Sequence, residues 1–366
     1  MKVALVHEFL TQYGGAERVL EAILEIFPDA TIHTLVYDKE KMGKYFGKYK
    51  IKTSFLQKMP LGIKKYKWYL TLMPKAIESF DFIGYDLVLS DASAFAKGVI
   101  TKKPTVHVCY CHTPTRYLWQ ESKFYIQTAG IPKIIQPIMP PVIKSLRKWD
   151  YKAAQRPDYF IANSKTVQKR IKKYYHRDSV VIYPSVDFDN FSPSTNTENF
   201  YLIAGRMVPY KRNDIVIQAF NILKDKKLIV AGDGYGLQDL KKIATSRNIE
   251  FVGRVSDNAL KKYFSTCKAF IFAAEEDFGI TPLEAMASGR PVIAYGKGGA
   301  TETIINGKTG VFFKEQTKES LIGAIKKYEA NKFNKNDAIL QAKKFEKKQF
   351  IDKIKKYIDE VMSAKH

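Results

Sequence analysis

A repeated alternation of short apolar runs with stretches of helical spacing constrains the fold of this chain more than any other sequence feature. The run at residues 2–6 is followed by a break at Gly14-Gly15, and residues 16–27 then repeat apolar side chains at helical spacing. Short, continuous apolar runs between helices are typical of parallel strands that are covered on both faces. Further runs of this kind lie at residues 30–35, 87–89, 106–111, 159–162 and 180–183.

The same alternation begins again after a polar stretch at residues 192–199. A chain of 366 residues is also too long for one compact core. The sequence therefore predicts an α/β fold of two facing, Rossmann-like, doubly wound domains, with the ligand in the cleft beyond the carboxyl ends of the strands. In the second half, strands are expected at 200–204, 227–231, 250–252, 269–273, 291–294 and 310–313, with helices between them, as at 214–223 and 257–264.

Cysteine usage and hydropathy indicate an intracellular protein. Cys109, Cys111 and Cys267 form an odd set without a CxxC pair, which argues against a disulfide framework and against a structural zinc site. Cys109 and Cys111 alternate along an expected strand, so both should be buried on the same side. The start of the chain lacks a signal-peptide pattern, and no apolar run approaches the ~20 residues of a membrane span. We therefore expect a cytoplasmic protein with peripheral membrane contact at most.

The charge of the chain is strongly basic. Lys and Arg number 60 against 37 Asp and Glu, which gives a formal net charge of +23. This excess favours polyanionic partners, namely nucleic acids, anionic lipids or phosphorylated substrates. A genome that favours lysine codons is the alternative explanation.

Basic and aromatic residues alternate between positions 39 and 75. This combination suits peripheral docking to an anionic membrane, on the inner face of the cytoplasmic membrane. A solvated helix face with packed aromatic rings is the other interpretation. The basic residues are Lys39, Lys41, Lys44, Lys48, Lys50, Lys52, Lys58, Lys64, Lys65 and Lys67, and the interleaved ones are Tyr45, Phe46, Tyr49, Trp68, Tyr69 and Leu70.

Two basic positions in the second half suit a diphosphate. Gly205-Arg206 follows an expected strand, and Lys211 precedes an expected helix. Cations beside a helix N-terminus bind diphosphates well, because the unpaired N–H groups and the helix dipole add to their charge. Taken alone, basic residues at such a turn are equally typical of a solvated surface.

An acidic stretch at residues 274–284 is less ordinary. Pro282 suits the first turn of a helix, so Glu276 precedes that helix and has capping as its simpler explanation. Glu284 lies about a turn further on, where a carboxylate can accept two hydroxyl hydrogens from a ribose. The N–H groups of residues 279–281 are open to an anion or to sugar oxygens.

In this region the chain resembles the retaining GT-B glycosyltransferases known as family 4, or group 1. Their acidic signature is two glutamates separated by seven residues, which is the spacing of Glu276 and Glu284. Other landmarks occur in family order, so the resemblance covers nearly the whole chain and is strongest at 200–310. They are Gly205-Arg206 with Lys211, Val230-Ala-Gly-Asp-Gly234, Phe251-Val-Gly-Arg254, Ala285-Met-Ala-Ser-Gly-Arg-Pro-Val-Ile-Ala294, Gly298-Gly-Ala-Thr-Glu302 and Asn306-Gly-Lys-Thr-Gly310.

The resemblance implies a GT-B fold and a role for each matched residue. Arg206 and Lys211 would hold the donor diphosphate, and Glu284 would bind the ribose. Glu276 would contact hydroxyls of the transferred sugar, and Arg254 would lie near the nucleobase. The backbone amides that would meet the sugar and the distal phosphate belong to Phe278, Gly279, Ile280 and Thr281.

The first half of the chain carries weaker matches to the same family. Gly14-Gly15 looks like the family's first glycine loop at a helix start, although a glycine pair alone is a common turn. His112 follows a strand, where an active-site loop belongs; by resemblance it contacts the donor sugar, whereas a lone histidine is more often structural. Arg116 would serve a phosphate or the acceptor.

The resemblance also implies retention of the anomeric configuration without an enzymic nucleophile, with the departing phosphate taking the acceptor's proton. Glu276 is expected to position the sugar rather than to attack it. No DxD motif or His/Asp cluster indicates a metal, and no cofactor is expected besides the nucleotide-sugar substrate. The expected domains are 1–192 for the acceptor, 193–345 for the donor, and an amphipathic helix at 346–366 that can cross back to the first domain.

The second half looks closest to bacterial mannosyltransferases of O-antigen and capsule assembly. GDP-mannose is therefore the favoured donor, and a glycan or lipid-linked oligosaccharide the acceptor. UDP- or dTDP-linked donors and a sugar-nucleotide 2-epimerase are the alternatives among enzymes, while a sugar phosphorylase would need a pyridoxal-binding lysine that is not recognised. A nucleic-acid-binding protein is the alternative from another class, but no RRM, KH or zinc-finger pattern occurs.

Overall fold

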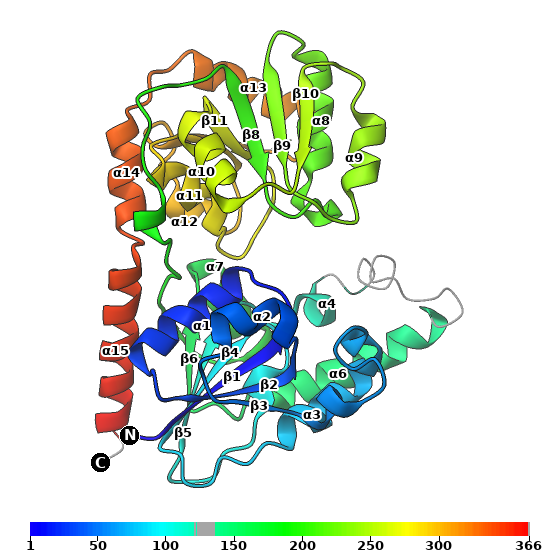
Figure 1. Cartoon of the computed structure of the whole chain (residues 1–366), viewed down its shortest axis with the longest axis vertical. Helices are drawn as coiled ribbons and strands as arrows, with labels where there is room; N and C mark the ends of the chain where they lie inside the picture. Colours follow the sequence, from blue (N-terminus) through cyan, green and yellow to red (C-terminus); the bar gives the residue numbers. More distant parts are fainter. Residues whose placement is uncertain (121, 123–135, 365–366) are drawn as a thin grey trace. The chain divides into compact units, whose positions relative to one another are not determined.

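The computed structural model of the chain describes residues 1–120, 122 and 136–364 and divides the chain into two compact units. The first contains Met1–Tyr183 and Ile351–His366, and the second contains Pro184–Phe350 (Figure 1). Each unit is built on one parallel sheet covered by helices. The predicted fold class, α/β with two Rossmann-like domains, is confirmed.

The sheet of the first unit has seven strands in the order β3-β2-β1-β4-β5-β6-β7, and every pairing is parallel. The central strands β1, β4 and β5 are buried almost throughout, which is why they occur as continuous apolar runs. Edge strand β3 is missed by the sequence analysis, because its three residues include one aliphatic side chain, Ile51. The strands are β1 (Val3–Leu10), β2 (Thr31–Tyr37), β3 (Ile51–Thr53), β4 (Leu87–Ala92), β5 (Val106–Cys111), β6 (Tyr159–Ala162) and β7 (Val180–Val181).

The core of the first unit contains Cys109 and Cys111, both buried in one hydrophobic cluster as predicted. The C-terminal helix α15 (Lys347–Ser363) belongs to this unit from Ile351 onward. Its predicted apolar stripe is buried at Ile354, Ile358 and Val361, so that face packs on protein. The other helices are α1 (Gly15–Ile26), α2 (Lys39–Phe46), α3 (Met73–Glu78), α4 (Arg116–Trp119), α6 (Met139–Ala153) and α7 (Lys165–Tyr175), with 3₁₀ turns η1 (Phe55–Lys58), η2 (Tyr66–Leu72), η3 (Ala96–Gly98) and η4 (Gln136–Ile138).

The sheet of the second unit has six parallel strands in the order β10-β9-β8-β11-β12-β13. The strands are β8 (Phe200–Ala204), β9 (Lys227–Ala231), β10 (Ile249–Gly253), β11 (Ala269–Phe272), β12 (Val292–Tyr295) and β13 (Gly310–Phe313). The helices are α8 (Asn213–Ile222), α9 (Leu237–Ile243), α10 (Asp257–Thr266), α11 (Ile280–Ala287), α12 (Ala300–Thr303), α13 (Lys318–Glu329) and α14 (Lys335–Lys343), with 3₁₀ turns η5 (Phe188–Asn190) and η6 (Pro209–Lys211). Every strand predicted for this half is present, with ends shifted by at most one residue.

Both sheets have a point at which the strand order reverses. In the first unit β1 lies between β2 and β4, and in the second unit β8 lies between β9 and β11. The connections that leave these neighbouring strands run in opposite directions along the sheet, which opens a crevice at the carboxyl ends. Ligands are therefore expected beyond β1 and β4 in one unit and beyond β8 and β11 in the other. Among the described residues, no helix is long and apolar enough to cross a membrane.

Candidate active site

In the second unit, the loops after β8 and β11 bring together two of the predicted residues. Lys211 ends η6, which follows β8, and Glu276 follows β11. Lys211 Nζ lies 3.1 Å from Glu276 Oε1, and the two side chains are 13% and 19% exposed. The sequence analysis predicted that both residues bind the donor, but it did not predict that they contact each other. They are neighbours because their loops leave the sheet at the point where the strand order reverses.

The loop that begins with Gly205 is shaped by its neighbour after β9. A Cβ atom on Gly232, whose φ is +139°, would lie 1.9 Å from the carbonyl oxygen of Gly205. The Met207 N–H donates to the carbonyl of Asp233 at 2.9 Å. Only glycine allows this approach, so the motif at residues 230–234 supports the Arg206 loop through its backbone.

A second glycine pair supports the loop after β11. The Gly299 N–H donates to the Glu276 carbonyl at 2.9 Å. A Cβ atom on Gly299 would lie 2.3 Å from the Cα of Phe278, and one on Gly298 would lie 2.5 Å from the Glu276 carbonyl oxygen. The motif at residues 298–302 thus holds the backbone of Glu276 in place, a structural role that the sequence match alone does not reveal.

The predicted donor-binding loop ends at the N-terminus of α11. Gly279 caps this helix in the left-handed region, at φ +82°, and Ile280 and Thr281 form its first turn, where N–H groups lack partners within the helix. Phe278 is buried, with its ring centroid 5.8 Å from that of Phe345. Glu284 is buried in the second turn of α11, and a buried carboxylate requires polar partners.

The two predicted arginines of this unit are more exposed. Arg206 lies in the loop after β8, and its Nη2 is 3.3 Å from the Tyr210 hydroxyl. Arg254 follows the edge strand β10 and is separated from β8 by β9. Both are thus at the carboxyl edge of the sheet, but in the described part of the chain neither forms a hydrogen bond or ion pair with Lys211 or Glu276.

In the first unit, His112 belongs to a buried ionisable cluster at the switch point. Its Nε2 lies 2.5 Å from Asp91 Oδ1, and His7 Nδ1 lies 2.8 Å from Asp91 Oδ2. The second nitrogen of His7 is 3.4 Å from Glu17 Oε1. His7, Asp91 and Glu17 were missed by the sequence analysis. The available signal was an ionisable residue within a largely apolar strand, at His7 in β1 and Asp91 in β4.

The cluster favours the protonated state of its histidines. Burial lowers the pKa of His7, but hydrogen bonds and charges from Asp91 and Glu17 outweigh it and raise the pKa to about 10. Burial likewise opposes the charge of His112, yet the Asp91 carboxylate raises its pKa above the usual value. For Asp91, burial favours the neutral form, and the two histidines nevertheless lower its pKa. Asp91 thus stabilises positive charge on both histidines that flank it.

The remaining predicted residues of this unit are Gly14, Gly15 and Arg116. Gly14 is the extended N-cap of α1 and Gly15 its first residue, so the glycine loop lies at a helix start as predicted. Arg116 is the first residue of α4 and is half-buried. Glu17, on the same helix as Gly15, reaches His7 and so connects the glycine loop to the cluster.

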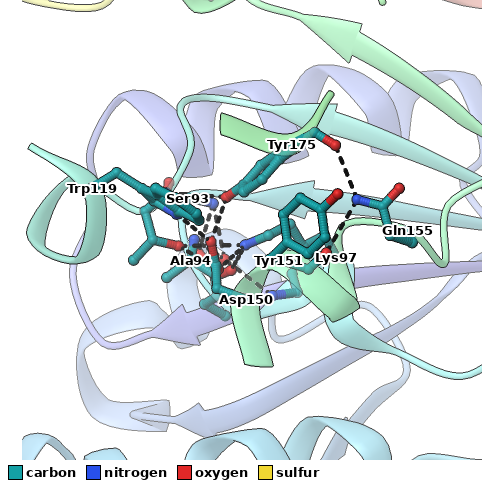
Figure 2. Close-up of polar contacts among 11 residues, drawn as sticks. Ser93, Ala94, Lys97, Trp119, Asp150, Tyr151, Gln155 and Tyr175 are labelled. Carbon is teal, nitrogen blue, oxygen red and sulfur yellow. Dashed lines mark hydrogen bonds and ion pairs between the residues drawn. The ribbon is translucent and has the colours of Figure 1, made fainter. Parts of the chain in front are cut away.

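A second buried network, shown in Figure 2, anchors the segment that carries Arg116. Asp150 of α6 accepts hydrogen bonds from Lys97 Nζ (2.5 Å), Thr115 Oγ1 (2.8 Å), Trp119 Nε1 (2.7 Å) and the Tyr175 hydroxyl (2.8 Å). Both ends of α4 are thereby fixed to one carboxylate, since Thr115 precedes the helix and Trp119 ends it.

Glu8 organises the backbone beside this network. Its carboxylate accepts the N–H groups of Ser93 (2.9 Å), Ala94 (2.6 Å) and Ala96 (3.1 Å). Lys97 donates in turn to the Ala94 carbonyl. The turn after β4 is thus hydrogen-bonded to Glu8 of β1, and Lys97 connects it to Asp150 of α6. The contacts of Glu8 and the network around Asp150 therefore meet at one segment of backbone.

Two family models match the chain. The one described as Glycosyltransferase Family 4 matches residues 13–190, and the one described as Glycosyl transferases group 1 matches residues 187–345. Together they cover residues 13–345, which include the residues described above apart from His7 and Glu8 of β1.

Individual proteins are similar to this chain at low identity. An uncharacterized glycosyltransferase of Methanocaldococcus jannaschii is 24% identical over 99% of this chain and 99% of its own length. The O-antigen chain mannosyltransferase RfbU of Salmonella typhimurium is 30% identical over 48% of this chain and 52% of its own length. Among solved structures, HepE of Anabaena in complex with UDP has a TM-score of 0.71 at 18% identity, over 98% of this chain and 100% of that one, which shows a common fold.

Proposed function

Because this chain belongs to the group 1 glycosyltransferases of the GT-B fold, we propose that it transfers a hexose from a nucleotide sugar to a glycan or a lipid-linked oligosaccharide in cell-surface polysaccharide synthesis. The observation that carries the proposal is the Lys211–Glu276 pair at the switch point, beside the N-terminus of α11. A cation, an acid and open N–H groups in one place suit a diphosphate joined to a sugar.

Mannose from GDP-mannose is the donor that we favour. The similarity to an O-antigen mannosyltransferase supports the sugar, although that match spans about half of each chain. The complex of HepE with UDP keeps a UDP-linked donor as the alternative. Sugar choice depends on a few contacts in the loops, so a direct comparison of donors has to decide it.

We assign the binding roles within the second unit as follows. Lys211 and Arg206 neutralise the diphosphate, Glu284 binds the ribose, and Arg254 lies beside the nucleobase. Glu276 orients the sugar hydroxyls, and its ion pair with Lys211 holds the carboxylate in a fixed position before the donor binds. The sugar and the distal phosphate meet the N–H groups of Phe278, Gly279, Ile280 and Thr281 at the start of α11.

In the reaction we propose, the bond between the anomeric carbon and the diphosphate oxygen breaks as the acceptor hydroxyl attacks from the same face. The hydroxyl proton passes to the departing phosphate oxygen, so the configuration is retained without an enzymic nucleophile or a metal. Negative charge grows on the leaving diphosphate, and Lys211 and Arg206 stabilise it there. His112 contacts the donor sugar, and Arg116 serves the acceptor or a phosphate.

A thermal-shift comparison of GDP-, UDP-, ADP- and dTDP-sugars tests the donor. A ligand that binds only the folded protein raises its apparent stability, by about 2.7 kcal/mol at a hundredfold excess over Kd. We expect GDP-mannose to give the largest shift and Lys211→Ala to reduce it. A larger shift with another nucleotide sugar would replace GDP-mannose, and release of a free epimer without any acceptor would favour the 2-epimerase.

We further propose that the first unit docks peripherally on an anionic membrane. Leu61 and Trp68 are 56% and 67% exposed, and Lys65 Nζ lies 5.3 Å from the Trp68 ring centroid. Only part of the predicted basic and aromatic stretch lies on the surface, because Phe46 and Leu70 are buried in the core. Exposed lysines lie close in sequence to the two apolar residues and suit anionic headgroups; they are Lys58, Lys64, Lys65 and Lys67.

Co-sedimentation with vesicles tests this surface. The wild-type protein should pellet with phosphatidylglycerol vesicles and not with phosphatidylcholine vesicles. The double variant Leu61→Asn/Trp68→Ala should lose most of this binding; asparagine tolerates the positive φ of Leu61. Ile222→Ser, at an equally exposed apolar residue of the second unit, is the control and should bind as the wild type. Equal binding to both lipids would contradict the proposal.

A further inference from the structure

The three central residues of the buried cluster, His7, Asp91 and His112, differ in their exposure to solvent. His7 and Asp91 are enclosed, whereas the side chain of His112 is 13% exposed. Both ring nitrogens of His7 are occupied, by Asp91 and Glu17. In the part of the chain that the structure describes, the ring of His112 has one hydrogen-bond partner, Asp91 at Nε2, which leaves Nδ1 for a ligand.

The position of the cluster is where a parallel sheet binds its ligands. His7 lies in the second half of β1, Asp91 near the carboxyl end of β4 and His112 directly after β5, and these strands are consecutive in the sheet. The strand order reverses between β1 and β4. Because His112 is the one of the three that reaches the surface there, its ring meets whatever binds beyond these strands.

We propose that Asp91 and His7 are positioning residues that hold the His112 ring as a charged hydrogen-bond donor, with its Nδ1–H directed at a hydroxyl oxygen of the transferred sugar. The inference rests on the proposed function, in which His112 contacts the donor. A hydrogen bond from a charged donor is about twice as strong as one from a neutral donor. A ring that is hydrogen-bonded to a buried carboxylate also keeps one orientation.

Several charged groups act on the protonation of His112. The carboxylates of Asp91 and Glu8 favour the charged ring, and the cation of His7 opposes it. Glu17 acts indirectly, because it raises the pKa of His7 and so helps to keep His7 charged. The nearest ring is that of Tyr110, edge-on to His112 at 5.3 Å between centroids. Because the pKa of His112 is raised, its active, charged form persists to higher pH than that of an ordinary histidine, and it is lost as pH rises through that pKa.

The two positioning residues should therefore move the pH profile in opposite directions. In Asp91→Asn the carboxylate charge is removed, the pKa of His112 falls, and transfer is lost at lower pH, by about tenfold for each pH unit above the new value. In His7→Gln the opposing cation is removed while Asp91 keeps a hydrogen-bond partner, so transfer persists to higher pH. A role in folding alone would lower activity without moving the profile.

The experiment measures kcat/KM against pH with the full-length protein, together with an NMR titration of the His112 ring, whose resonance is identified by its loss in His112→Gln. Asp86→Asn, at the exposed amino end of the same strand β4, is the control and should leave both curves unchanged. Opposite shifts in the two variants support the inference. Unmoved profiles, or a His112 pKa in Asp91→Asn that is not lowered, overturn it.

The two readouts separate failure of the inference from failure of the proposed function. If the wild-type protein transfers no sugar at any pH, the proposed function fails, and the NMR titration still measures the coupling among His7, Asp91 and His112. If Asp91→Asn does not fold, His7→Gln decides alone, because only an upward shift of the His112 pKa and of the pH profile agrees with the inference.

Discussion

Replacement of Lys211 by alanine should lower kcat for sugar transfer by about 10²–10³-fold, which corresponds to roughly 2.7–4 kcal/mol of transition-state stabilisation. The ammonium group neutralises the leaving diphosphate, and it also holds Glu276 at 3.1 Å. Since both side chains retain some contact with solvent, loss of the pair should cost folding only about 1 kcal/mol. Steady-state kinetics with the best donor, alongside thermal unfolding, separates the two effects.

A matched control for this variant lies at the other end of the same sheet. Lys227 Nζ is 2.8 Å from Glu250 Oε2, and Lys227 begins β9, at its amino end. Lys227→Ala removes a lysine–glutamate pair of similar length, but far along the strand from the proposed donor. It should keep wild-type kinetics. Wild-type turnover by Lys211→Ala would remove Lys211 from the proposed mechanism.

Disruption of the buried Lys97–Asp150 pair should have the largest effect on stability. Both side chains are 1% exposed, and Nζ and Oδ1 are 2.5 Å apart (Figure 2). Lys97→Met leaves a buried carboxylate without its cation, and Asp150→Asn leaves a buried ammonium without its anion. Either should lower the free energy of unfolding by about 3–5 kcal/mol, or the melting temperature by on the order of 10 °C.

The double variant Lys97→Met/Asp150→Asn should be more stable than the sum of the single losses predicts, because it leaves no unpaired charge in the core. The asparagine oxygen can still accept from Trp119 or Tyr175. Lys172→Met is the control, since its ion pair with Asp178 is largely exposed and should contribute less than about 1 kcal/mol. Denaturant unfolding measures all four variants; strictly additive losses would show that the two charges are not coupled.

Several features of the fold could be predicted from the sequence because their signals are local. Strands buried on both faces occur as apolar runs, so β5, β6 and β8 are predicted with their observed ends. The amphipathic period of α15 predicted that Ile354 and Ile358 would be buried, and they are. Strand β3 was missed because three residues with one aliphatic side chain carry no such signal.

The candidate site was predictable only in part. The spacing of Glu276 and Glu284 indicates a family, and the loop positions of Lys211 and His112 follow from the strands before them. That Lys211 would pair with Glu276 depends on β8 and β11 being neighbours in the sheet, which no local pattern states. The roles proposed for these residues stay predictions until the variants are measured.

By itself, the sequence determined the period of each element, the residues that face a core, and the turns at which glycine is required, because each depends on a few adjacent residues. The tertiary structure alone decided which loops meet. His7 and Asp91 are 84 positions apart, and Lys97 and Asp150 are 53 apart, yet each pair is in contact. Strand order and helix packing set these contacts, since they are the outcome of how all the apolar faces of a unit are buried together.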